Sequence, residues 1–200
     1  MQKMNYRILL LFLFPITVFA QSYKISVGSN ITSYEFANSA GTNPIALRSE
    51  SGLALGLSRE TSLSKVFVLD LGLSYNQFNT VGDIQNIPLA YSTDFMGLSV
   101  GVGPSLSLGK GFSFSAKAVA TASGMVKGNQ FIQNRYVDLF ADKQFNSLRT
   151  LYGYSFEINK QINEQVGVFA KYQHLDSYNF GSSTLNFIPS TFSIGLSLSK

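Results

Sequence analysis

Few side chains in this sequence are suited to covalent chemistry. Among its 200 residues there is one histidine, His174, and no cysteine. A hydroxyl nucleophile needs a neighbouring base, and that base needs a carboxylate to orient it. His174 precedes Asp176 and Ser177, but His-Leu-Asp-Ser matches no nucleophile arrangement, and a lone histidine near a strand end is typical of a surface. We therefore expect no enzymatic activity.

Metal binding has as little support. With one histidine and no cysteine, scattered carboxylates would have to supply most of the ligands. Asp138 and Asp142 are the one close pair, at the spacing of a short helix, and such a pair is typical of a solvated face. We expect no metal ion and no other cofactor.

Seven charged residues stand in segments that alternate apolar and small polar side chains. They keep the phase of Ser, Gly, Thr, Asn or Gln and never that of the apolar set. Charges within a membrane are costly unless paired, so they are candidates for function, with a conducting or gating role as one interpretation. The simpler interpretation is that they fill a narrow barrel interior. The seven are Lys24, Glu60, Asp70, Lys117, Arg149, Glu157 and Lys171.

The alternation itself predicts strands. It is clearest in FMGLSVGVGPSLSLG, residues 95–109, where large apolar residues share one face and Ser and Gly the other. A soluble strand usually carries Lys, Glu or Thr on its wet face, whereas Ser and Gly alone are typical of a strand between lipid and a narrow polar lumen. Eight such strands are predicted, over 23–34, 52–61, 65–78, 94–109, 111–126, 148–160, 165–174 and 187–199.

The connections alternate between long and short. Long ones span 35–51, 79–93, 127–147 and 175–186, and short ones fall at 62–64, 110 and 161–164. Long external loops and short periplasmic turns are what an up-and-down barrel requires when both termini are periplasmic. The predicted fold is therefore an all-β, eight-stranded antiparallel up-and-down transmembrane β-barrel over residues 21–200.

Individual side chains refine this prediction. In strand 165–174, Val168 and Ala170 face lipid, which puts Phe169 in the lumen. Arg59 and Lys160 interrupt the apolar face beside short turns, where a long cationic chain can snorkel to the interface. Five tyrosines near strand ends suit an interfacial aromatic girdle: Tyr34, Tyr75, Tyr91, Tyr152 and Tyr172.

Four of the lumenal charges are expected to meet. Each lies three to six residues from an expected short turn. At about 3.3 Å per residue, all four reach the periplasmic half to middle of the lumen. Because an unpaired charge there carries a heavy desolvation cost, the sequence predicts one ion-paired cluster of Asp70, Lys117, Glu157 and Lys171.

The segment 127–147 is unusually apolar for an exposed loop. Loops on a rigid scaffold commonly carry function, and exposed apolar patches often mark partners. The alternative is that these side chains lie at the membrane interface or pack on neighbouring loops. The candidate partner residues are Phe131, Ile132, Tyr136, Leu139 and Phe140.

The N-terminus and the composition agree with export to a membrane. An apolar run from Ile8 to Phe19 follows Lys3 and Arg7 and ends in Val18-Phe19-Ala20, which predicts a cleaved signal peptide over residues 1–20. A transmembrane anchor would need roughly 20 apolar residues. Charged residues make up only 13% of the chain, and this low charge without long apolar runs is typical of barrel strands. The net charge of +4 is too modest to favour a nucleic-acid partner.

These features resemble those of a known family. The signal ending before Gln21-Ser22, the eight alternating strands, the Gly109-Lys110-Gly111 turn and the Gly-Val-Gly-Pro element at 101–104 are similar to the Bacteroidetes outer-membrane β-barrel family, the PorT-like group. The chain is more loosely similar to the small OmpA and OmpX barrels. Its last strand, TFSIGLSLSK, lacks the usual terminal aromatic residue. The resemblance implies membrane insertion and transfers no catalytic residue.

The expected function follows from these observations. We expect a structural or interaction barrel with a plugged lumen and partner-facing loops, in the outer membrane of a Gram-negative bacterium. Its expected partners are outer-membrane lipid, the barrel-assembly machinery and an unidentified protein. The alternatives are a narrow passive channel and, third, a lipid A-modifying enzyme.

Overall fold

The computed structural model describes residues 21–36, 46–84, 87–142, 144–178 and 185–199, so the expected signal peptide lies outside it. Within these ranges no helix has the length and apolar character needed to cross a membrane. The described chain forms strands β1 (Gln21–Phe36), β2 (Ala46–Ser62), β3 (Phe67–Ile84), β4 (Ile87–Gly109), β5 (Phe112–Ile132), β6 (Arg135–Asp138), β7 (Arg149–Gln161), β8 (Val166–Tyr178) and β9 (Leu185–Ser199).

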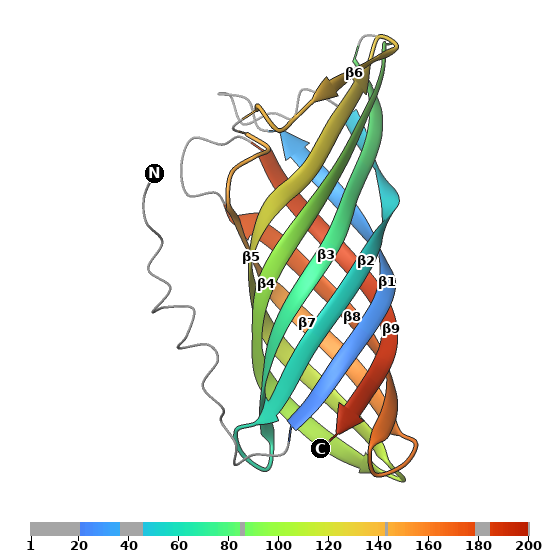
Figure 1. Cartoon of the computed structure of the whole chain (residues 1–200), viewed down its shortest axis with the longest axis vertical. Coiled ribbons are helices and arrows are strands. Elements are labelled where there is room, and N and C mark those ends of the chain that lie inside the picture. Colours follow the sequence, from blue (N-terminus) through green and yellow to red (C-terminus); the bar gives the residue numbers. More distant parts are fainter. Residues whose placement is uncertain (1–20, 37–45, 85–86, 143, 179–184, 200) are drawn as a thin grey trace.

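Eight of these strands close into a ring (Figure 1). The hydrogen-bonded order is β4-β3-β2-β1-β9-β8-β7-β5, and pairing of β4 with β5 completes the circle. The short β6 lies outside the ring, since among the described strands it pairs with β5 alone. The predicted eight-stranded antiparallel up-and-down barrel is therefore confirmed, with one short additional strand.

The strands run further toward the loop end of the barrel than the sequence predicts. Residues 79–93 were expected to form a long loop, but β3 and β4 stay paired from Asn79 and Ser92 to Ile84 and Ile87. β5 likewise continues to Ile132 and turns back through Gln133 and Asn134 into β6. The apolar alternation ends where the lipid ends, while the backbone groups beyond that point still need hydrogen-bond partners. The apolar alternation, which depends on contact with lipid, therefore predicts strands that are shorter than the observed ones.

The outer face of the ring is apolar in the predicted phase. The side chains exposed on it include Leu71, Leu98, Val100, Ile194 and Leu196. Such a continuous apolar surface is far larger than the patches that soluble monomers expose. The surroundings that fit it are lipid, as in transmembrane barrels.

β8 keeps the predicted phase as well. Val168 is exposed, whereas Phe169 is buried in the lumen. Gly195 lies opposite Phe169 in the β8–β9 register. A Cβ at Gly195 would come within 2.6 Å of the Phe169 ring, so the glycine makes room for an aromatic side chain in a narrow interior.

Leu71→Arg tests the lipid-facing phase. Leu71 is 42% exposed on β3, and an arginine there should destabilise the barrel by about 2–4 kcal/mol if it lies near the midplane. Leu63→Arg is the matched control, because Leu63 is 50% exposed but lies in the turn between β2 and β3. Urea unfolding in phospholipid vesicles measures both variants. Equal, small effects would contradict the membrane phase of β3.

Candidate functional site

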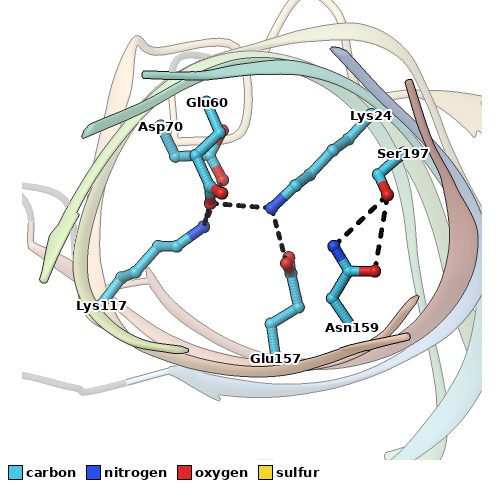
Figure 2. A network of polar contacts seen from close by, with 7 residues as sticks. All are labelled: Lys24, Glu60, Asp70, Lys117, Glu157, Asn159 and Ser197. Carbon is cyan, nitrogen blue, oxygen red and sulfur yellow. Dashed lines mark hydrogen bonds and ion pairs between the residues drawn. The ribbon is translucent and has the colours of Figure 1, made fainter. Parts of the chain in front are cut away.

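Five charged side chains meet inside the barrel toward the short-turn end (Figure 2). The Lys24 Nζ atom lies 2.7 Å from Glu60 Oε2 and 2.6 Å from Glu157 Oε1. The Lys117 Nζ atom lies 2.5 Å from the same Glu60 oxygen and 2.9 Å from Asp70 Oδ2. These contacts form one chain of alternating charge, which we call the lumenal ion network: Glu157, Lys24, Glu60, Lys117 and Asp70.

The strand register explains why this network needs lysines. Glu60 of β2 and Asp70 of β3 are direct cross-strand neighbours. Two like charges in such a position repel each other. Lys117 reaches both carboxylates across the lumen from β5, and Lys24 adds a second cation to Glu60. The two lysines therefore turn a repulsive carboxylate pair into an attractive group.

Small residues give these long side chains their space. Lys24, Lys117 and Glu157 are all buried. Gly101 faces the network from β4, where an added Cβ would touch both the Asp70 and the Lys117 side chains at 3.6 Å. Ser155, on β7 directly opposite Lys117, is buried beside it. The small Gly and Ser residues on the lumenal face of the strands thus leave the space that the long charged side chains occupy.

Lys171 stands at the edge of the network. It lies directly opposite Glu157 in the β7–β8 register, but the described residues offer it no ion pair within 4.0 Å, since Glu157 contacts Lys24 instead. It shares with Asp70 the lining of a lumenal cavity of about 50 Å³. With Lys171 included, three lysines face three carboxylates, so the charges of this half of the lumen balance.

The structure brings together Asp70, Lys117 and Glu157 of the four residues predicted to cluster, and places Lys171 beside them. Sequence reasoning left out Lys24 and Glu60, although both have the lumenal phase. The count of residues from the turns gave the depth of each Cα only. A lysine or glutamate side chain then spans several ångströms more, which is how Lys24 reaches both Glu60 and Glu157.

A second group fills the lumen toward the long-loop end, and we call it the outer aromatic cluster. Phe187 is its centre, with its ring centroid 4.5 Å from that of Tyr34 and 5.5 Å from that of Phe95. The Tyr34 hydroxyl also bonds Thr93 at 2.7 Å and donates to the Phe78 carbonyl at 2.8 Å. The buried members are Tyr34, Phe78, Leu89, Tyr91, Phe95, Met125, Leu139, Phe145, Leu185 and Phe187.

This cluster corrects the predicted aromatic girdle. Tyr34 and Tyr91 are buried inside the barrel, while Tyr152 and Tyr172 lie on its outer face. The signal was present in the parity of the sequence, because Tyr34 and Tyr91 are out of phase with the lipid-facing residues of β1 and β4. Being near a strand end is therefore a weaker guide than being in phase with the lipid-facing set.

Arg149 belongs to the outer aromatic cluster rather than to the ion network. Its guanidinium lies 4.3 Å from the Phe187 ring centroid, within cation–π range. It donates to the Leu185 carbonyl at 2.9 Å and to the Gln144 carbonyl. This buried arginine thereby ties the start of β7 to the start of β9 and to the segment before β7.

The predicted partner segment divides into an inner and an outer part. Leu139 is only 3% exposed and packs in the outer aromatic cluster, so its assignment to a partner surface was wrong. Phe131 and Ile132 are partly buried. Tyr136 and Phe140 are 78% and 47% exposed. Only these two of the five candidate residues are freely available to a partner.

The segment after β6 is built of turns and not of the short helix considered for Asp138 and Asp142. The Asp138 carboxylate accepts a hydrogen bond from the Phe140 N–H, and that of Asp142 from the Gln144 N–H, each at 2.8 Å. Both side chains therefore cap turns. In the described part of the chain, no three His, Asp or Glu residues gather as a metal site would require.

His174 faces outward and contacts a residue that the sequence did not suggest. Its Nδ1 atom lies 2.8 Å from Ser190 Oγ, and its Nε2 atom lies 4.0 Å from Asp176 Oδ1. Ser177, the hydroxyl considered from the sequence, accepts a hydrogen bond from the Phe187 N–H instead. The distance from Nε2 to Asp176 exceeds that of a hydrogen bond, so this carboxylate does not orient the ring as a catalytic triad requires.

Comparison with known proteins identifies the fold. No family model matches the sequence, and no curated protein does. Among solved structures, the barrel is similar to the outer membrane protein OprG from Pseudomonas aeruginosa, with 13% identity, a TM-score of 0.53, and coverage of 91% of this chain and 97% of that one. It is also similar to Neisserial surface protein A, with 13% identity, a TM-score of 0.50, and coverage of 88% and 96%. The chain therefore has the fold of small outer-membrane β-barrels. This fold and the apolar outer face together support a location in the outer membrane.

Proposed function

We propose that this protein is an outer-membrane barrel with a closed lumen and an interaction role. Two separate groups of side chains support the closed lumen. The lumenal ion network crosses it near the short turns, and the outer aromatic cluster fills it near the long loops. Three cavities along the lumen, lined by described residues, measure about 50, 20 and 40 Å³. Spaces of this size hold single waters or a few of them, which supports a lumen closed to solutes.

The interaction role is supported by a sheet that extends past the membrane. β3, β4 and β5 rise to the end of the barrel where β6 lies, beyond the loop ends of β1 and β9 (Figure 1). Rigid scaffolds that carry exposed segments commonly place their binding residues there. Because β6 is an edge strand, its free side also offers backbone groups to a partner.

The observation that carries this proposal is the exposure of large apolar side chains on that extension. Tyr136 and Val137 of β6 and Phe140 beyond it are exposed. β6 folds back along β5, so Tyr136 lies opposite Phe131, five residues beyond Val126, which is the last exposed apolar residue on β5. This displacement from the lipid-facing residues of β5 supports a protein partner as the contact of the exposed Tyr136 ring.

Photo-cross-linking tests this surface in intact cells. A photoreactive residue in place of Tyr136 should give a discrete protein adduct, because this side chain is 78% exposed beyond the lipid-facing belt. The same residue in place of Tyr172, which lies on the lipid-facing side of β8, is the matched control and should give no protein adduct. If position 136 gave the same pattern as position 172, the interaction surface would be wrong.

A further inference from the structure

A marked depression lies on the lipid-facing side of the barrel, among residues that the structure describes. It spans β7, β8, β9 and β1, holds about 540 Å³, and is lined by apolar side chains together with Lys160. The strand register explains its shape, because Ala170 stands between Ile158 and Ile194 in one cross-strand row. One methyl group between two branched chains leaves a groove, which we call the Ala170 groove.

Lys160 provides a fixed cation in the lining of this groove. It lies opposite Val168 in the next cross-strand row toward the short turns. Its ammonium donates to the Lys110 carbonyl and lies 4.3 Å from the Phe112 ring centroid. A lysine ammonium has three donors, so this anchoring leaves capacity for an anionic ligand. The ammonium is thus held on the β5 side of β7 at the short-turn end, at the β7 edge of the groove.

The charge of the whole rim favours an anion. Outside the lumen, the described residues near the short turns include four cations and one carboxylate: Arg59, Lys65, Lys110, Lys160 and Glu164. The opposite, long-loop end has the reverse balance outside the lumen, with seven carboxylates and three cations: Glu35, Glu50, Asp83, Asp94, Asp138, Asp142, Asp176, Arg48, Lys127 and Arg135. Anionic headgroups are therefore attracted at the short-turn rim, which is the periplasmic one in barrels of this type.

From these features we propose that the Ala170 groove binds one anionic phospholipid of the periplasmic leaflet. An acyl chain lies along the groove over Ala170, and the phosphate pairs with the Lys160 ammonium. A diacyl phospholipid fits because its charge and its chains are separated in the same way as the cation and the apolar lining. The proposal requires only that the barrel spans a membrane, so it does not depend on whether Tyr136 meets a partner.

Lipid selectivity measures the site directly. The refolded protein is placed in phosphatidylcholine vesicles, and the motionally restricted fraction of spin-labelled phosphatidylglycerol is compared with that of spin-labelled phosphatidylcholine. The wild type should favour phosphatidylglycerol. Lys160→Gln should reduce this preference by about fivefold, the effect of one interfacial cation. Lys65→Gln removes the same charge from the turn between β2 and β3, three to four strands away around the ring, and should reduce the preference much less.

A second pair of variants tests the groove apart from the charge. Ala170→Leu fills the floor of the groove and should lower the restricted fraction of both lipids. Ala118→Leu adds the same bulk at an exposed, lipid-facing position of β5 outside the groove and should change neither. Equal effects of Lys160→Gln and Lys65→Gln would show general rim attraction and overturn the site. An unchanged restricted fraction in Ala170→Leu would overturn the placement of the acyl chain. A heat-dependent gel shift confirms that each variant is folded.

Discussion

Lys117→Met is expected to destabilise the barrel by about 3–5 kcal/mol, the typical effect of removing one partner from a buried ion pair. The substitution keeps the apolar volume of the side chain but leaves Asp70 without its ion-pair partner. It also leaves Glu60 and Asp70 as cross-strand neighbours with Lys24, on Glu60, as their remaining ion-pair partner. The midpoint and slope of urea unfolding in phospholipid vesicles give this free energy.

Neutralising the carboxylates should reverse most of this loss. The triple variant Lys117→Met, Glu60→Gln, Asp70→Asn has no uncompensated carboxylate next to the missing lysine. The triple variant should therefore be much more stable than the summed losses of Lys117→Met and of the two carboxylate substitutions would give. The double variant Glu60→Gln, Asp70→Asn serves as the control, since it leaves Lys117 without both of its partners. If the free energies of all these variants were simply additive, the ion pairs would not be coupled as the geometry indicates.

Phe187→Ala is expected to cost about 3–5 kcal/mol, as for a large aromatic side chain removed from a packed core. Phe187 is fully buried at the centre of the outer aromatic cluster. Its ring contacts Tyr34 and supports the Arg149 guanidinium. Truncation therefore opens a cavity and removes the aromatic face beneath a buried cation. Unfolding in vesicles measures the loss, and near-ultraviolet circular dichroism of the tyrosines reports the local repacking.

Phe192→Ala is the matched control for this prediction. Phe192 lies on the same strand, β9, but on its lipid-facing side, where it is 58% exposed. Lipid chains can fill the space left by its ring, so no cavity forms and the cost should be much smaller. A loss at Phe192 as large as that at Phe187 would mean that the two faces of β9 are assigned incorrectly.

The fold was predictable because lipid imposes a strict pattern. Alternation in residues 95–109 identified the lipid-facing side of β4. The phase of Val168 and Ala170 in strand 165–174 likewise placed Phe169 inside the barrel, against the expectation for a large apolar residue. The strand ends beyond the membrane were not predictable in this way. There neither face is required to be apolar, and β3 and β4 continue over residues that looked like a loop.

The interior was predictable in kind but not in its contacts. The phase identified the lumenal charges of the described residues, yet it did not show that Lys24 bridges Glu60 and Glu157 while Lys171 stays outside the ion pairs. The pairing of these charges depends on which side chains cross the lumen. The alternation along a single strand does not contain this three-dimensional information. The outer aromatic cluster was missed for a different reason, since Tyr34 and Tyr91 were interpreted by their position near strand ends instead of by their phase.

Single-channel recording in planar bilayers tests the closed lumen most directly. Refolded wild-type protein, its folded state verified by the gel shift on heating, is added to a membrane held at a fixed voltage. If the ion network and the outer aromatic cluster close the lumen, the current should stay at the level of the bare bilayer, without steady steps. Reproducible open steps of constant size from the wild type would contradict the account and identify the barrel as a channel.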